Sequence, residues 1–359
     1  MRKSLFVLAL FLIGYKLIVC GKNNDGLPIL RLVYQHPTPV ITIQHRDAKN
    51  IKFGFEGGTV VKDGKTYHLF TSEMMDNPIW VKMRLAHWVS TDKTRWKRAA
   101  TIQTSTGDFT GNDPRAALWS PMVVWDAADN RWNLFYVAYN AAPCTPEQMR
   151  LNMNGKIFRS VAKIAGKKGI NGPFIDKGIV LQSDSVDSWE GLQGTDSFYP
   201  YQVDNKWYAF YGSANTEKMP IEHWLVGYAK SKSSSIAGPW KRCSEINPSK
   251  IEKTFIENPI VTKIADGYIV IYDNLVSDAM GWAFSKDGIH WGEGQSLKIQ
   301  TKDGNWAKDV RTVLGLVPEG NGKYTVFYTG FEQKPDWPRL LTGIGKETCV
   351  VGFVEIQIE

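Results

Sequence analysis

Five segments of this 359-residue chain repeat one pattern, in which a short polar turn is followed by alternating aromatic and β-branched residues. The segments are KDGKTYHLFTSE from Lys62, AADNRWNLFYVAYN from Ala127, VDNKWYAFYGSA from Val203, ADGYIVIYDN from Ala265 and GNGKYTVFYTGF from Gly320. Each contains an Asp-Gly, Asp-Asn or Asn-Gly pair, which tolerates the positive φ of a tight hairpin turn. Because an apolar segment precedes each turn, the sequence predicts five β-hairpins of one kind.

The spacing of these hairpins indicates the architecture. They recur every 55 to 75 residues, measured at Asp63, Asp129, Asp204, Asp266 and Asn321. Each interval has room for two more strands, and no long amphipathic helix interrupts the pattern. We therefore predict an all-β chain that folds as a five-bladed β-propeller of four-stranded antiparallel blades, with residues 21–359 as a single domain. A two-sheet sandwich is the alternative, but it does not explain five similar turns.

The last predicted strand, CVVGFVEIQIE, has no following partner in the chain. We expect it to share a blade with residues from the N-terminal region, because closing the ring removes exposed sheet edges.

The N-terminus has the features of an export signal. Arg2 and Lys3 precede the apolar run SLFVLALFLIGY, which has the length and position of a secretory hydrophobic region. Cys20 follows an apolar triplet, as in a bacterial lipoprotein signal, although Val19 stands where a small residue is expected. We predict that residues 1–20 are a signal peptide and that the protein is periplasmic or at the cell surface. A lipid anchor on Cys20 and an uncleaved N-terminal anchor both stay open.

Charge and cysteine content exclude several kinds of partner. Removal of Arg2, Lys3 and Lys16 lowers the formal charge from +7 to +4, and the remaining basic residues are scattered, so we expect no nucleic-acid partner. The remaining cysteines, Cys144, Cys243 and Cys349, lack paired zinc-ligand spacing. No cofactor or metal site is predicted. One disulfide and a structural calcium ion in the channel are left open, and the oligomeric state is not predicted.

Charged residues stand just before the predicted first strand of most blades. They are Glu56, Asp196, Glu257 and Asp309 with Arg311, and Ser120 occupies the corresponding place in the second blade. In a propeller the first strands line the central channel, so these residues are expected to meet at one end of its axis. Like charges gathered there raise the pKa of at least one carboxyl group. An acidic cluster of this kind needs a functional reason.

Carboxyl groups around an aromatic pocket suit the hydrolysis of glycosidic bonds. One carboxyl group stays protonated and donates to the leaving oxygen, and another stays ionised and activates water. Five tryptophans lie in connecting segments or near strand ends, where indole faces can stack on sugar rings. They are Trp80, Trp119, Trp189, Trp224 and Trp306.

The segments FEGGTVV, LWSPMVVW, GTDSFYPYQVDNKWYAFYGS and IENPIVTKIADGYIVIYDN, in this order, resemble glycoside hydrolase family 43 and related propeller families, among them β-L-arabinofuranosidases. The resemblance covers most of the chain after about residue 50. It implies that Glu56 takes the place of the base, Asp196 that of the residue that tunes and orients the acid, and Glu257 that of the acid. This chain departs from the family's Asp-Pro and Glu-Gly-Pro motifs, because Gly57, Ser197 and Asn258 follow the three acids.

The function predicted from these features is hydrolysis of a terminal glycosidic bond, of a pentose or furanose unit in a plant or algal polysaccharide, with inversion. The partner is then an oligosaccharide or polysaccharide, and the expected substrate-binding residues are Trp119, Ser120, Glu190, Asp309 and Arg311. Glu190 also competes for the base or acid role. Two alternatives stay open: a non-catalytic carbohydrate-binding propeller, and a glycoside phosphorylase of the family 130 type, for which only Arg311 is well placed.

Overall fold

The computed structural model describes residues 26–184, 187–299 and 306–359, so the predicted signal peptide and Cys20 lie outside the described residues. The described residues form β-strands over most of their length, with one 3₁₀ turn, η1 (Lys167–Asn171), and one short helix, α1 (Trp337–Leu341). Neither helical segment of this part of the chain has the length and apolar character to cross a membrane. The predicted all-β class is confirmed.

Runs of four consecutive antiparallel strands, here called meanders, make up the described chain. Three meanders are separate sheets, in which the strands pair in chain order. They are β6 (Ala117–Asp126), β7 (Arg131–Asn140), β8 (Met153–Ala162) and β9 (Phe174–Gln182); β10 (Asp196–Val203), β11 (Lys206–Ala214), β12 (Trp224–Ser231) and β13 (Trp240–Arg242); and β14 (Glu257–Ile264), β15 (Gly267–Asp273), β16 (Ala279–Ser285) and β17 (Gln295–Lys298). The four-stranded antiparallel sheets predicted from the sequence are thus present.

Two further meanders are joined in one eight-stranded sheet. The strands are β2 (Gly54–Asp63), β3 (Thr66–Asp76), β4 (Lys82–Ser90) and β5 (Lys97–Thr104); and β18 (Asp309–Gly320), β19 (Lys323–Phe331), β20 (Cys349–Ile358) and β1 (Leu30–Gln35). The parallel pair of Gly54 with Cys349 joins β2 to β20. β1 pairs with β20, so the N-terminal strand completes the last meander, as predicted.

All five predicted hairpins form, and each joins the first two strands of a meander. Their closing pairs are Asp63 with Thr66, Asp126 with Arg131, Val203 with Lys206, Ile264 with Gly267 and Gly320 with Lys323. The predicted turn chemistry is visible in the backbone. Asp204 and Asn205 both have positive φ, at 47° and 61°, which a two-residue hairpin turn of this hand requires.

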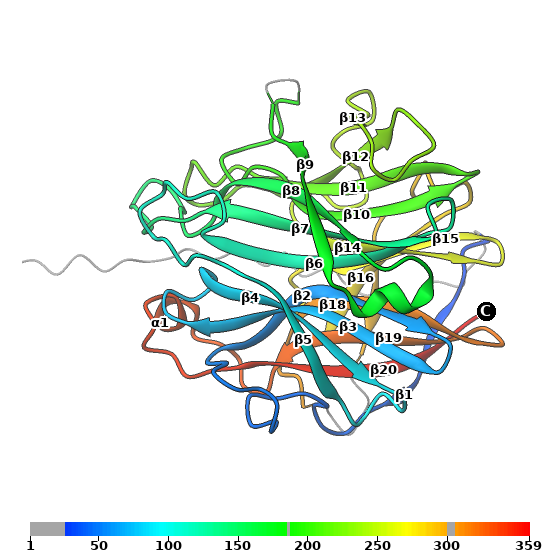
Figure 1. Ribbon diagram of the computed structural model, residues 1–359, viewed down its shortest axis with the longest axis horizontal. Helices are drawn as coiled ribbons and strands as arrows, with labels where there is room; N and C mark the ends of the chain where they lie inside the picture. Colours follow the sequence, from blue (N-terminus) through cyan, green and yellow to red (C-terminus); the bar gives the residue numbers. More distant parts are fainter. Residues whose placement is uncertain (1–25, 185–186, 300–305) are drawn as a thin grey trace, which may run out of the picture.

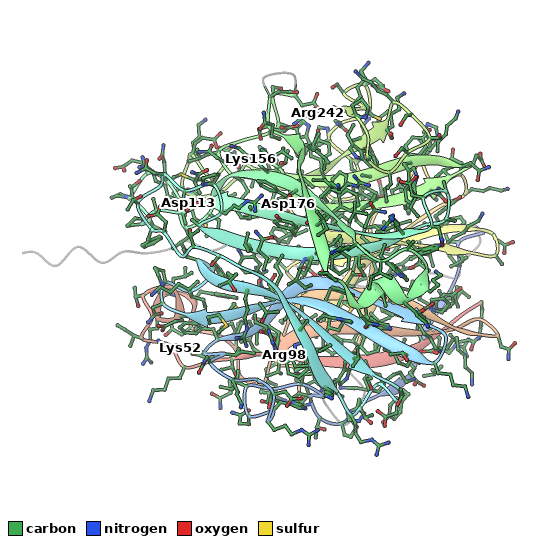
Figure 2. All side chains as sticks on the ribbon, viewed as in Figure 1. Lys52, Arg98, Asp113, Lys156, Asp176 and Arg242 are labelled. Carbon is green, nitrogen blue, oxygen red and sulfur yellow. The ribbon has the colours of Figure 1, made fainter. Side chains whose placement is uncertain are left out.

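Neighbouring meanders share a hydrophobic core, and side chains fill the space between their ribbons (Figure 2). Around the molecule the cores contain Phe70 with Leu134, Phe135 with Phe198, Phe210 with Val270, Ile269 with Tyr328, and Phe327 with Phe55. The last of these joins the β18 meander to the β2 meander, so the cores form a closed cycle. Figure 1 shows the β6 and β10 meanders lying beside one another and, next to them, the eight-stranded sheet.

The first strands of the meanders lie at the centre of this cycle. β2, β6, β10, β14 and β18 contact one another in that order, and β18 contacts β2 again. The beginnings of strands that are far apart in the sequence are therefore brought together, as the ring arrangement predicted.

Gly54 allows the two ends of the ring to meet. Its φ is 95°, and a Cβ added there would lie 1.8 Å from the carbonyl oxygen of Cys349.

Gly54→Ala should therefore destabilise the fold by about 3 to 5 kcal/mol, through overpacking and a left-handed backbone. Gly64→Ala is the matched control, because Gly64 has a φ of 59° with no atom within 4 Å of its added Cβ. It should cost only about 1 to 2 kcal/mol. Urea unfolding followed by tryptophan fluorescence measures both, and equal losses would contradict this role of Gly54.

Candidate active site

A β-bulge at the same place in each first strand positions the side chains of the site. The register shifts after Glu56 in β2, Trp119 in β6, Asp196 in β10 and Glu257 in β14, and between Val310 and Val313 in β18. The residue that follows has positive φ in four of these described strands: Gly57, Ser120, Ser197 and Asn258. A bulge leaves one residue outside the ladder and re-aims its neighbours. The five bulges therefore direct side chains toward the axis.

These bulges give one cavity its floor. Glu56, Trp119, Asp196, Glu257 and Arg311 all line a cavity of about 720 Å³. Its walls come from the connections between the second and third strands of the meanders, which contribute Trp80, Met149 with Asn152, Met219 to Glu222, Leu275, and Trp337 with Leu341. Every meander thus contributes both to the floor and to the wall.

Hydrogen bonds among the bulge residues hold the floor together. Ser120 donates from Oγ to Asn258 Oδ1 at 2.9 Å, and the Asn258 backbone N–H donates to Ser197 Oγ at 3.2 Å. Asn258 Nδ2 donates to Asp273 Oδ2 at 2.9 Å, and Asp273 Oδ1 accepts from the Val313 backbone N–H at 2.8 Å. These contacts link the β6, β10, β14 and β18 meanders beneath the cavity.

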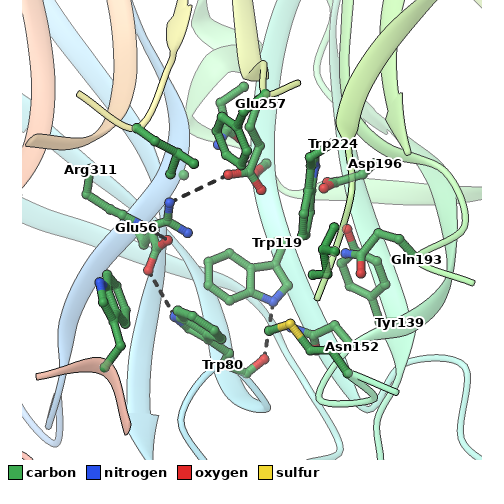
Figure 3. Close-up of a pocket in the computed structure, with 18 of the residues that line it drawn as sticks. Glu56, Trp80, Trp119, Tyr139, Asn152, Gln193, Asp196, Trp224, Glu257 and Arg311 are labelled. Atoms are coloured by element: carbon green, nitrogen blue, oxygen red, sulfur yellow. Dashed lines mark hydrogen bonds and ion pairs between the residues drawn. The ribbon is translucent and has the colours of Figure 1, made fainter. Parts of the chain in front are cut away.

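Arg311 bridges two of the predicted catalytic carboxylates. Its Nε lies 2.5 Å from Glu56 Oε1, and its Nη1 lies 3.7 Å from Glu257 Oε2. The second oxygen of Glu56 accepts from Trp80 Nε1 at 3.0 Å. The guanidinium lies over the rings of Trp80 and Trp337, 5.9 and 5.6 Å from their centroids. Glu56 is thus held by an ion pair and a hydrogen bond at once (Figure 3).

Burial raises the pKa values of three acids near Arg311, which are Glu257, Asp273 and Asp196. Burial raises the pKa of Glu257 well above its usual value, and the nearby charges of Asp196, Asp273 and Glu56 raise it further against the opposing effect of Arg311. Burial also raises the pKa of Asp273, to about 8, and that of Asp196. Burial and the neighbouring acids thus favour the protonated form of Glu257.

Asp196 is oriented by its own neighbours. The Tyr139 hydroxyl hydrogen-bonds its carboxyl group, and the Ser197 backbone N–H donates to Asp196 Oδ1 at 2.5 Å. Figure 3 shows Asp196, Tyr139 and Gln193 on one side of the cavity, with Glu56 and Arg311 opposite them.

Six of the eight predicted site residues meet in the cavity: Glu56, Trp119, Ser120, Asp196, Glu257 and Arg311. The position equivalent to Glu56 is Trp119 in β6, one residue before Ser120, and Arg311 in β18, two residues after Asp309. Asp309 opens β18 opposite Phe331 and is not among the lining residues. The bulges shift each strand by a residue, which the sequence did not show.

Glu190 also lies outside the cavity lining. Its carboxylate accepts from Arg242 Nε at 2.5 Å and from the Tyr211 hydroxyl at 2.9 Å. Both contacts join the segment before β10 to β11 and β13, so the structure gives Glu190 a structural setting rather than a place beside the predicted catalytic acids.

Three of the five predicted tryptophans line the cavity: Trp80, Trp119 and Trp224. Trp189 packs against Tyr211 and Trp306 stacks on Tyr328, with ring centroids 5.5 and 5.4 Å apart. Sequence reasoning did not identify Tyr139, Gln193 and Trp337, which line the cavity, or Asp273, which belongs to the hydrogen-bond network beneath it.

The described residues contain no cluster of three or more His, Cys, Asp or Glu side chains arranged to hold a metal ion. Cys144, Cys243 and Cys349 are free thiols, so the disulfide left open by the sequence does not form among these three.

Replacing Arg311 should expose the electrostatic cost of the cavity. Arg311→Met leaves Glu56 and Glu257 without their cation, and we expect a loss of about 3 to 5 kcal/mol at pH 8. A carboxyl group whose folded pKa is raised destabilises the fold as pH rises through that pKa, so the loss should be smaller at pH 5. Urea unfolding at both pH values measures this.

Arg95→Met is the control, because Arg95 pairs with Asp92 at the surface with 88% of its side chain exposed. It should cost no more than about 1 kcal/mol at either pH. A loss for Arg311→Met that does not change with pH would contradict the proposed compensation.

Comparisons with known proteins establish the fold. No protein-family model matches the chain, and a search of curated proteins gives no match. Among solved structures it is similar to Zg3597, a family 117 glycoside hydrolase of the marine bacterium Zobellia galactanivorans, at 13% identity and a TM-score of 0.60 over 91% of this chain and 90% of that one. A thermostable family 43 glycoside hydrolase matches at 14% identity and a TM-score of 0.58, over 91% and 96%. A GH43_1 enzyme of Xanthomonas citri complexed with xylotriose matches at 13% identity and a TM-score of 0.55, over 89% of each chain. The chain therefore has the β-propeller fold of these hydrolases.

Proposed function

We propose that this protein is a glycoside hydrolase that removes a terminal sugar from an oligosaccharide or polysaccharide by carboxylate acid–base catalysis. The observation that carries the proposal is that Glu56 and Glu257 both pair with Arg311 but have different electrostatic surroundings. Glu56 is held by Arg311 and Trp80, whereas burial and neighbouring acids raise the pKa of Glu257. A carboxylate and a carboxylic acid facing one cavity are the two groups that glycoside hydrolysis needs.

In this mechanism Glu257 donates its proton to the glycosidic oxygen as the bond to the leaving sugar breaks. Glu56 accepts a proton from water as that water attacks the sugar carbon from the opposite face. Asp196, oriented by Tyr139, keeps a negative field beside Glu257 and favours its protonated form. Inversion follows if water fits between Glu56 and the sugar, and the resemblance to family 43 supports this outcome.

Action on a chain end is supported by the cavity's shape. Connections from all five described meanders surround it, which suits a single terminal unit better than a polymer passing through. A pentose or furanose unit of a plant or algal polysaccharide is the proposed substrate, and the xylotriose bound by the Xanthomonas citri enzyme is consistent with it.

The remaining parts of the proposal concern the whole chain. We count the eight-stranded sheet as two blades joined at Gly54 and Cys349, which makes a five-bladed, single-domain propeller. The apolar N-terminal run supports export to the periplasm or cell surface, with lipidation of Cys20 as the form of anchoring to test.

Leaving-group dependence tests the two glutamate roles. Candidate substrates come from a screen of xylan, arabinan and pectic oligosaccharides. Glu257→Gln should lower kcat/KM on the trisaccharide that is cleaved by about 10² to 10⁴-fold, yet leave the matching glycosyl fluoride near the wild-type rate, because fluoride needs no proton. Glu56→Gln should lower both rates, because both reactions need activated water.

The pH profile gives a second reading of the same roles. A general acid loses activity as pH rises through its pKa, so the wild-type basic limb should lie well above the ordinary range of a glutamate and vanish in Glu257→Gln. Glu245→Gln, an exposed glutamate outside the cavity, is the control. Binding without turnover on every oligosaccharide would instead indicate a carbohydrate-binding propeller.

A further inference from the structure

A short connection forms the cavity wall beside the proposed acid. The connection from β15 to β16 spans only residues 274–278, whereas the connections at 141–152, 215–223 and 332–348 are longer. The connection at 77–81 is equally short, but its Trp80 folds inward onto Glu56. In contrast, Leu275 and Val276 stay 46% and 41% exposed. Apolar side chains at an open rim are suited to contact something that extends out of the cavity.

The backbone holds this rim in an unfavourable conformation. Leu275 has a φ of 61°, which is uncommon for a residue with a large apolar side chain. The turn is fixed on both sides, because the Val276 N–H donates to Asn274 Oδ1 at 3.1 Å and the Val310 N–H donates to the Ser277 carbonyl at 2.9 Å. Strain of this kind persists where the surrounding structure imposes it, and it is concentrated at functional sites.

The rim belongs to the same meander as the acid. Asp273, which ends β15, is the register partner of Glu257, and Leu275 lies two residues further along. On the other flank, Phe255 lies two residues before Glu257 and packs against Trp224 with ring centroids 6.1 Å apart. Leu275, Phe255 and Trp224 all line the cavity. Glu257 therefore lies between an apolar rim and an aromatic pair.

We propose that Leu275, together with the Trp224–Phe255 pair, forms the subsite for the leaving-group sugar. This inference rests on the proposed function, because the acid must contact the oxygen that joins the terminal unit to the rest of the chain. The leaving sugar then lies beside Glu257, where the C–H faces of a ring can pack on leucine and aromatic carbon.

Leu275→Asn tests the subsite without adding strain. Asparagine tolerates positive φ better than leucine, so the variant should unfold at the wild-type temperature or above it. The probes are xylotriose and an arabinofuranose trisaccharide, with xylosyl and arabinofuranosyl fluoride as substrates that lack a leaving sugar. We expect kcat/KM on the cleaved trisaccharide to fall about 3 to 10-fold, mainly through KM, and on the matching fluoride to stay within about twofold of wild type.

Ile344→Asn is the control, because Ile344 is 64% exposed in the connection before β20 and does not line the cavity. It should change neither rate. Equal losses on trisaccharide and fluoride, or no loss on either, would overturn the subsite while leaving the hydrolase intact.

Binding separates failure of the subsite from failure of the proposed function. If the wild type cleaves no trisaccharide, its affinity for xylotriose and the arabinofuranose trisaccharide is measured by calorimetry. A weaker affinity in Leu275→Asn than in wild type and Ile344→Asn would uphold the subsite in a binding protein. Unchanged affinity, or no binding by the wild type, would overturn it.

Discussion

Closure of the ring of meanders is the constraint on which the site depends. The pairing of β1 with β20, the contact of Gly54 with Cys349, and the core shared by Phe55 and Phe327 bring the last meander back to the first. Only a closed cycle makes the first strands face a common axis. The bulges then use that geometry, because a residue just before a bulge at the same depth in every strand is directed into the same space.

Gathering acids in this space has a large electrostatic cost. Glu56, Asp196, Glu257 and Asp273 are brought together with one described cation among them, Arg311. A buried charge pair does not repay its own desolvation unless its remaining hydrogen-bonding capacity is also used. The arrangement uses it at Glu56, where Trp80 takes the second oxygen, and leaves Glu257 under-compensated. The ionised form of Glu257 is therefore disfavoured, which keeps on this side chain the proton that the proposed general acid donates.

How far the sequence predicts this structure depends on whether each feature is local. The hairpins were predictable because turn chemistry and alternation lie within about a dozen residues. The acids were located because they precede those hairpins at a similar distance. Trp119 and Arg311 were both named, but the strand position equivalent to Glu56 was assigned to Ser120 in β6 and to Asp309 with Arg311 in β18. Nothing in a single sequence marks a bulge whose extra residue is serine or threonine.

Other residues of the site could not be found from local pattern. Glu190 resembled a loop acid near Asp196, and its partner Arg242 is 52 residues away. Trp337 comes from the connection between β19 and β20, which lies outside the repeated hairpin pattern of the sequence. Asp273 is different, because it ends the hairpin that begins at Glu257. Counting back from the turn at Asp266 and Gly267 would have paired the two acids approximately, with the bulge as the only error.

The exposed fractions of the two proposed catalytic side chains agree with the way the substrate would lie in the cavity. The Glu56 side chain is 4% exposed and that of Glu257 is 13% exposed. An acid that acts at the bond between an enclosed sugar and an external chain has to stand at the boundary between them, whereas a base that activates water behind the sugar has to be deeper. The short connection that carries Leu275 follows the same logic, because it lies on the meander that carries the shallower glutamate. The proposed leaving-group subsite is thus on the side where the mechanism needs the rest of the substrate to leave the cavity.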